Sequence, residues 1–87
     1  MKVAVWDTYV PLKDGRMMHF DIIAPEEIRD ENLIYKYGKE YLASKNLADR
    51  ELTSSECRFC HIEELKEEWK NQIQSKGYYI YEMENCL

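Results

Sequence analysis

Residues 2–24, KVAVWDTYVPLKDGRMMHFDIIA, decide the fold because their pattern is typical of a β-hairpin. The segments Lys2–Val10 and Met17–Ala24 are rich in β-branched and aromatic residues, which fit a pleated surface. Between them, the pair Asp14-Gly15 is a strong hairpin signal, and Pro25 ends the second segment. The chain is therefore predicted to begin with two antiparallel strands.

The register of this hairpin follows from the requirement that one face be apolar. A three-residue loop, Lys13–Gly15 with Gly15 in the left-handed conformation, separates apolar from polar residues, whereas a two-residue loop mixes them. The longer loop places Val10 opposite Met18, Thr8 opposite Phe20 and Trp6 opposite Ile22 on the apolar face. On the other face it places Tyr9 opposite His19 and Asp7 opposite Asp21.

Two helices and two further strands are expected after the hairpin. Asp30 is a suitable N-cap for the first helix and Asn46 a suitable stop. The apolar stripe of this helix contains Ile34, Tyr37, Gly38, Tyr41 and Leu42, and its glycine indicates close approach to the sheet. The short segment Cys57–Ile62 is ambiguous in type. A second helix carries Leu65, Trp69 and Ile73 and stops at Gly77, before a last strand over Tyr78–Met83.

These elements predict one compact α+β domain over residues 1–87. The chain order is ββαβαβ, with a mostly antiparallel sheet and two helices packed on one face. A chain of 87 residues buries one modest core. This size excludes a large enclosed active site and leaves a small binding, assembly or accessory module, or a shallow surface site.

Charge and hydropathy narrow the range of partners. Seventeen acidic residues against twelve basic ones give a net charge of −5, and the basic residues are scattered along the chain. Nucleic-acid binding needs a clustered basic face, so we expect neither a nucleic acid nor a membrane as partner. The N-terminal segment is too polar for a signal peptide, and no segment is long and apolar enough to span a membrane. We expect a cytoplasmic protein with three reduced cysteines.

Three segments resemble a small bacterial family known as domain of unknown function 2024. They are DTYVPLKDGRMMHFD (Asp7–Asp21), ECRFCHIEE (Glu56–Glu64) and GYYIYEMENC (Gly77–Cys86). The resemblance implies a compact α+β domain of about this length and implies no activity. The positions that match the family pattern include Asp7, Thr8, Tyr9, His19, Phe20, Asp21, Cys57, Cys60, His61 and Cys86.

The motif Cys57-x-x-Cys60-His61 allows three interpretations besides buried thiols. It matches the pattern of covalent haem attachment, but without an export signal we expect no c-type haem. A zinc site could draw on Cys57, Cys60, His61, Cys86 and His19. Thiol-redox chemistry would use the same cysteines but lacks the thioredoxin-like context.

The conformation of this segment decides between these interpretations. An extended segment points residues three apart to opposite faces, so that Cys57 and Cys60 share no metal. A helical segment, capped by Thr53-x-x-Glu56, would place Cys57, Cys60 and His61 on one face. We prefer the extended form, in which free cysteine behaves as a small hydrophobe, and we expect no cofactor.

The polar face of the hairpin, with Asp7, Tyr9, His19 and Asp21, is a second candidate site. Two opposed carboxylates raise at least one pKa when buried, which suits acid–base chemistry or a hard metal ion. The simpler interpretation, which we prefer, is a solvated polar face or an aspartate that holds His19 by a hydrogen bond.

Tyrosines suggest an interaction surface. In the last strand Tyr79 and Tyr81 share one face, and with Tyr9 they form an amphipathic surface typical of protein interfaces. The alternative is packing against a loop or the C-terminus. We therefore expect an accessory or self-associating module, such as a homodimer, without catalysis. The alternative function is metal binding or thiol-redox chemistry at the cysteine cluster, and the sequence indicates no substrate.

Overall fold

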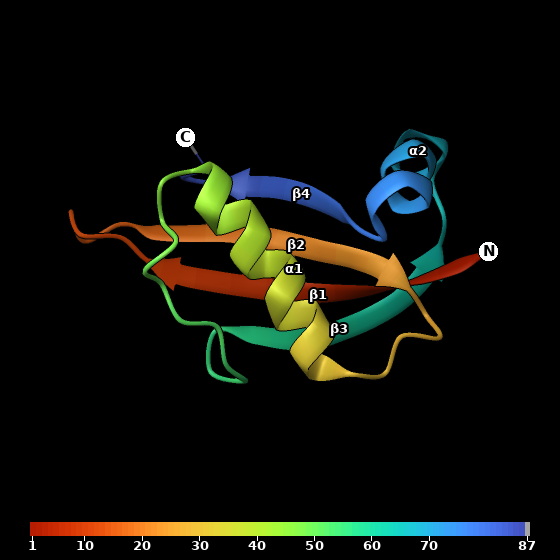
Figure 1. Cartoon of the computed structure of the whole chain (residues 1–87), viewed down its shortest axis with the longest axis horizontal. Helices are drawn as coiled ribbons and strands as arrows, with labels where there is room; N and C mark the ends of the chain where they lie inside the picture. The colour runs from red at the N-terminus through yellow and green to blue at the C-terminus, as the bar shows by residue number, and fades with distance from the viewer. Residues whose placement is uncertain (87) are drawn as a thin grey trace.

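The computed structural model describes residues 1–86, which form one four-stranded antiparallel sheet and two helices (Figure 1). The order along the chain is β1 (Lys2–Pro11), β2 (Met17–Pro25), α1 (Glu31–Ser44), β3 (Cys57–Glu64), α2 (Glu67–Lys76) and β4 (Tyr79–Glu84). The strands lie side by side in the order β3-β1-β2-β4. The predicted α+β class and the order ββαβαβ are confirmed.

The hairpin of β1 and β2 has the predicted register. Val10 pairs with Met18, Trp6 with Ile22 and Asp7 with Asp21. The backbone N–H of Leu12 donates to the carbonyl of Arg16 at 2.8 Å and closes the loop. Gly15 has a φ of +90°, the left-handed conformation that this loop requires.

Helix α1 begins and ends where the sequence predicts. The Asp30 side chain accepts a hydrogen bond of 3.0 Å from the backbone N–H of Asn32, and Asn46 has a positive φ of 64° just beyond the helix. Gly38 is buried against the sheet, and a Cβ there would lie 3.0 Å from Cδ1 of Ile22 and would overlap Cδ1 of Leu52. The absence of a side chain at Gly38 therefore allows this close approach without displacing Leu52.

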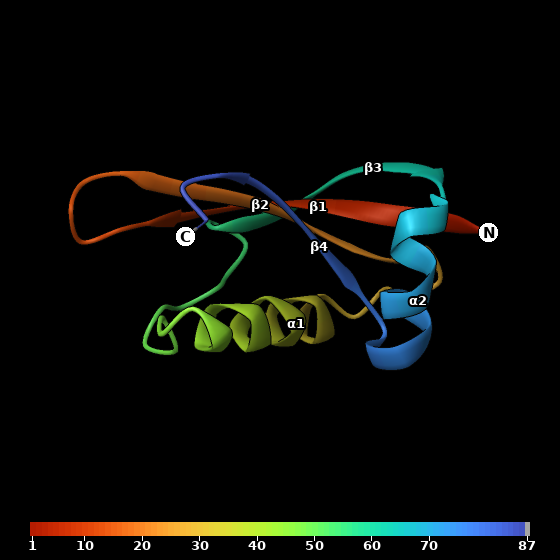
Figure 2. The ribbon, with the colours of Figure 1, turned by 90° about the horizontal axis from the view of Figure 1, so that it is seen from above.

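Helix α1 covers one face of the sheet and builds the larger core there (Figure 2). The buried members of this core are Ala4, Trp6, Val10, Met18, Phe20, Ile22, Ala24, Ile34, Leu42, Leu52, Cys57 and Tyr78. The face that α1 does not cover is called the open face below. No helix in residues 1–86 is long and apolar enough to cross a membrane.

Helix α2 differs from the expectation that both helices share one face. It stands at the end of the sheet near the N-terminus (Figure 2). Its Trp69 and Ile73 pack with Val3, Val5 and Ile23 in a second, smaller core. Side chains alternate along a strand, so these three strand residues point away from the α1 core. The hairpin is apolar on both faces at this end, and α2 covers the second face.

Strand β3 is extended, which is the conformation that we preferred for this segment from the sequence, but it carries a β-bulge at Cys60. Val5 pairs with His61 and the next residue, Trp6, pairs with Phe59, which leaves Cys60 as the extra residue. Cys57 is buried in the α1 core, whereas Cys60 is exposed. The structure therefore separates the two cysteines, as the extended form requires.

Candidate functional site

Three polar side chains gather at the centre of the open face. Asp7 from β1 and Asp21 from β2 are opposite each other, and His19 lies two residues before Asp21 on the same strand. Residues two apart in a strand point to the same face, so the register brings all three together. One ligand atom from each lies within 4.8 Å of the others. We call these three residues the open-face cluster.

The distances in the cluster are too long for hydrogen bonds. His19 Nε2 lies 3.6 Å from Asp21 Oδ1 and 3.9 Å from Asp7 Oδ1. The side chains of His19 and Asp21 are only 13% and 16% exposed. Among the described residues, His19 Nε2 and Asp21 Oδ1 have no hydrogen-bond partner although both atoms are buried. The Asp7 side chain is 36% exposed, so the cluster has one side open to solvent and two buried polar atoms without a hydrogen-bond partner in the described chain.

The imidazole of His19 is held in place by Tyr9. The two rings stack with centroids 4.1 Å apart and an interplanar angle of 14°. This stacking fixes the plane of the imidazole, so that Nε2 faces the two carboxylates. The predicted pairing of Tyr9 with His19 thus orients a ligand atom.

The environment of Asp21 disfavours its negative charge. Burial, together with the neighbouring carboxylate of Asp7, raises the pKa of Asp21 to about 7. The electrostatic interaction of Asp21 with His61 opposes this rise in pKa, and the interaction with Glu63 adds to it. A bound cation would relieve the repulsion between Asp7 and Asp21, because it would pair with both carboxylates.

Cys60 and His61 lie next to the cluster, at the bulge of β3. The Nδ1 atom of His61 is 3.2 Å from Sγ of Cys60, and its Nε2 atom is 3.3 Å from Oε2 of Glu63. Partial desolvation and the carboxylate of Asp7 raise the pKa of the Cys60 thiol. Burial likewise raises the pKa of Cys57. Neither thiol therefore has the lowered pKa of an activated nucleophile.

The structure does not bring the predicted zinc ligands together. Cys57 lies in the core beneath α1. Cys86 follows β4, where its Sγ donates to the carbonyl of His19 at 3.2 Å. Only Cys60, His61 and His19 lie on the open face, because the extended strand and the bulge separate them from Cys57. The alternative zinc site of Cys57, Cys60, His61 and Cys86 is therefore not assembled as a single cluster in residues 1–86.

The predicted interface tyrosines are on the open face. Tyr81 pairs with Asp21 and Tyr79 with Ile23, so both side chains point to that face. Tyr9 and Tyr81 are 46% and 45% exposed. Tyr79 is half-buried, and its ring stacks on Trp69 of α2 with centroids 6.0 Å apart. Two of the three tyrosines are therefore available for a partner.

The comparisons with known proteins identify the family of this chain. The family model described as "Domain of unknown function (DUF2024)" matches residues 1–83. The chain belongs to the DUF2024 family. The resemblance noted in the sequence is thereby confirmed, and the family description states no activity. No curated protein matches.

A solved structure has the same fold. The chain is similar to the NMR structure of protein NE1680 from Nitrosomonas europaea, with 41% sequence identity and a TM-score of 0.86. The similarity covers 100% of both chains. The name of that protein gives no activity, so the function of this DUF2024 member has to be argued from its own side chains.

A groove on the α1 side of the sheet was not predicted from the sequence. It lies between the start of α1 and β3, and Phe59 and Ile62 contribute to its lining. In a regular strand these two residues would point to opposite faces, but the bulge at Cys60 brings them to the same one. The segment CRFCHI contains no glycine or other bulge signal, so the sequence offered no means of finding this groove.

Proposed function

We propose that the open-face cluster binds a divalent transition-metal ion, with Asp7, His19 and Asp21 as ligands. The observation that carries this proposal is the convergence of three ligand atoms within 4.8 Å, two of them buried without a hydrogen-bond partner. Buried polar atoms without partners are unfavourable in a folded protein, and a metal ion would satisfy both.

The spacing of the ligand atoms suits a small ion. Bonds of about 2.0–2.2 Å in a tetrahedral zinc site separate neighbouring ligand atoms by roughly 3.3–3.6 Å. The distances of 3.6 and 3.9 Å from His19 Nε2 require the carboxylates to move by only a few tenths of an ångström. One imidazole and two carboxylates favour Zn²⁺, Co²⁺ or Mn²⁺ over the all-oxygen sites preferred by Ca²⁺.

Cobalt and zinc titrations test this proposal. We expect Co²⁺ to give a visible spectrum without a sulfur-to-metal charge-transfer band, and Zn²⁺ to displace it. Binding should strengthen from pH 6 to pH 8, because metal competes with the proton on Asp21, whose pKa is about 7. His19→Gln and Asp21→Asn should abolish binding, whereas Asp49→Asn, which removes an exposed charge elsewhere, should not.

Cysteine variants separate this site from the cysteine-based alternative. Cys57→Ala and Cys86→Ala should leave metal binding unchanged, and Cys60→Ser should reduce it by less than about two-fold, since no thiolate belongs to the ligand set. A Co²⁺ complex with a sulfur charge-transfer band, or binding that survives His19→Gln in a folded variant, would contradict the proposal.

A second candidate function is self-association through the open face. Four large side chains there are between 45% and 50% exposed: Tyr9, Met17, Tyr81 and Met83. Exposed aromatic and methionine side chains around a partly polar centre are typical of protein interfaces. Tyr81→Glu should shift a dimer to monomer in sedimentation experiments, and a strict monomer at millimolar concentration would exclude this candidate.

The wider role follows from these two candidates. We propose a non-catalytic accessory protein in the cytoplasm that carries a metal ion, associates with a second copy, or does both. The absence of a lowered thiol pKa at Cys57 and Cys60 supports a role other than thiol chemistry. Sedimentation with and without a chelator separates the two candidates, because metal binding by one chain needs no partner.

A further inference from the structure

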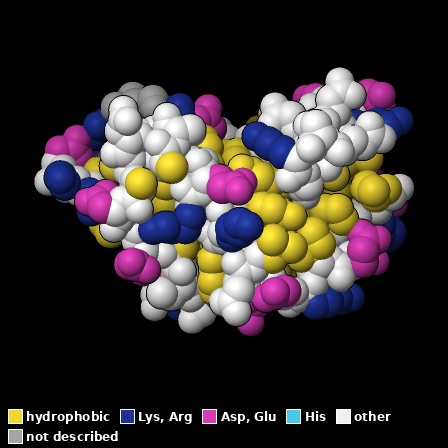
Figure 3. Space-filling model, viewed as in Figure 1, with side chains coloured by type: hydrophobic (Ala, Val, Ile, Leu, Met, Phe, Trp, Pro, Cys, Tyr) yellow, Lys and Arg dark blue, Asp and Glu magenta, His cyan; other side chains and the backbone are white. Residues whose placement is uncertain are grey.

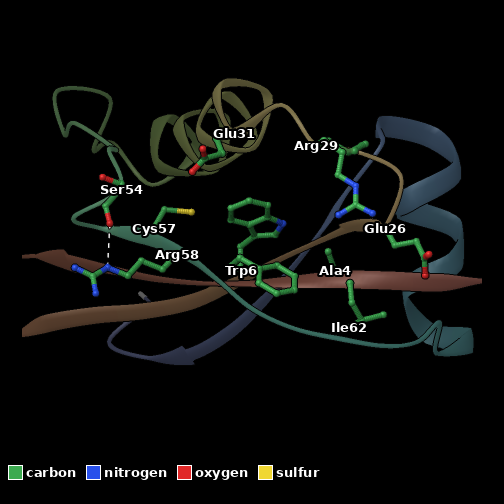
Figure 4. Close-up of a pocket in the computed structure, with 11 residues that line it drawn as sticks. Ala4, Trp6, Glu26, Arg29, Glu31, Ser54, Cys57, Arg58 and Ile62 are labelled. Atoms are coloured by element: carbon green, nitrogen blue, oxygen red, sulfur yellow. Dashed lines mark hydrogen bonds between the residues drawn. The ribbon is translucent and has the colours of Figure 1, made fainter.

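A groove opens on the α1 side of the sheet, on the face opposite the metal candidate. In the view of Figure 3 an uncovered hydrophobic area lies beside α1, toward α2. The groove has a volume of about 510 Å³, within the range of small-molecule sites. Its apolar lining comes from Ala4, Trp6, Ile28, Phe59 and Ile62 (Figure 4).

Trp6 brings an unsatisfied donor to this groove. Its side chain is only 7% exposed, and its ring packs edge-on against Phe59 with centroids 5.7 Å apart. Within residues 1–86 the buried Nε1 atom has no hydrogen-bond partner. An indole N–H only donates, so this atom needs an acceptor that the described chain does not provide.

Arg29 adds a positive charge at the same place. Figure 4 shows its guanidinium group pointing toward the nitrogen side of the Trp6 indole. A guanidinium has no acceptor, so Arg29 cannot satisfy the indole N–H. None of the ion pairs among the described residues includes Arg29. Two donors therefore converge on one end of an apolar groove.

We propose that this groove binds a small apolar monocarboxylate. The carboxylate accepts a hydrogen bond from Trp6 Nε1–H and pairs with Arg29, and its hydrocarbon part lies along Ala4, Phe59 and Ile62. Arg29 is exposed, so its side chain can move aside to admit the carboxylate. Glu26 and Glu31 also line the groove and disfavour a second negative charge on the ligand.

Octanoate is the test ligand, observed by the indole N–H signals of Trp6 and Trp69 in two-dimensional NMR. We expect a saturable downfield shift of the Trp6 signal, with the Trp69 signal of the smaller core unchanged. Octanol, which lacks the charge, and suberate, which carries two, should each bind at least about five-fold more weakly than octanoate.

Two arginine variants provide a matched pair. Arg29→Gln should weaken octanoate binding at least about five-fold and leave octanol binding unchanged. Arg58→Gln removes the same charge from the other part of the groove, where Nε of Arg58 donates to the carbonyl of Ser54 at 3.0 Å, and should change octanoate binding less than two-fold.

Three results would overturn the proposal. They are no shift of the Trp6 signal at millimolar octanoate, equal shifts of both tryptophan signals, and equal binding of octanoate and octanol. Because the Trp6 signal is observed in the unaltered protein, the test does not depend on a core variant that fails to fold. The site is independent of the metal candidate, and either proposal can fail alone.

Discussion

Replacing Asp21 with asparagine is expected to stabilise the metal-free protein at pH 8. The pKa of Asp21 is raised to about 7 in the folded chain, from an ordinary value of 3.8. Between these two values the folded state holds a proton that the unfolded chain has released. The free energy of unfolding therefore falls as pH rises from about 4 to about 7, and the loss is complete above that range.

The size of this effect follows from the same difference. A pKa difference of this size corresponds to roughly 4 kcal/mol for an isolated buried group. The Asp21 side chain keeps some contact with solvent, so solvent screening reduces the expected gain of Asp21→Asn to about 1–2 kcal/mol at pH 8. At pH 4 the carboxyl is protonated in the folded state, so asparagine should change the stability little.

Urea unfolding at pH 4 and pH 8, in the presence of a chelator, measures this difference. Asp49→Asn is the matched control, because it removes the same charge from an exposed loop and should have little effect at either pH. With Zn²⁺ the order reverses, since only the wild-type chain gains stability from the ion. An Asp21→Asn variant that is less stable than wild type at pH 8 without metal would refute the reasoning.

Three further predictions concern the fold and the thiols. Gly38→Ala should destabilise the protein by about 1 kcal/mol in thermal unfolding, because a Cβ at this position would overlap Leu52 Cδ1. In a Leu52→Ala background the same substitution should instead be neutral or stabilising. An equal loss of stability in both backgrounds would contradict the steric argument. Gly77→Ala should lower the free energy of unfolding by about 1–2 kcal/mol, since Gly77 has a φ of +95° and a Cβ would lie 2.8 Å from the Tyr37 hydroxyl. An unchanged midpoint of urea unfolding would contradict this prediction. In thiol titration with an aromatic disulfide, exposed Cys60 should react in the folded protein, and buried Cys57 should react only on unfolding. Asp7→Asn should speed the reaction of Cys60 at pH 8, because it lowers the raised pKa of the Cys60 thiol. Equal rates for the two cysteines would disagree with the structure.

The hairpin register could be predicted because several local signals agree. Alternation of apolar residues, the Asp14-Gly15 pair and the need for one apolar face all select the same pairing of Trp6 with Ile22. Once this register is known, it follows that one face of the hairpin carries Asp7, His19 and Asp21. What could not be predicted is their burial, because it depends on neighbours from β3 and β4 that are distant in sequence.

The cysteine segment shows where local patterns are insufficient. Glu56 accepts hydrogen bonds of 2.8 Å from both the backbone N–H and the hydroxyl of Thr53, so the capping-box residues do interact. They close a single turn before β3 instead of starting a helix, because pairing with β1 extends the chain from Cys57 onward. The bulge at Cys60 is likewise set by the fit between β1 and β3. The position of α2 depends on the apolar residues that the hairpin presents on its second face.

The bulges affect whether a second copy of the protein can add a strand to the edges of the sheet. Both outer strands of the sheet carry one, at Cys60 in β3 and at Met83 in β4. Glutamates also stand on these strands, at positions 63 and 64 of β3 and 82 and 84 of β4. An interrupted row of backbone groups and like charges both oppose strand addition from a neighbouring copy. These features of the outer strands therefore disfavour edge-to-edge aggregation of the sheet.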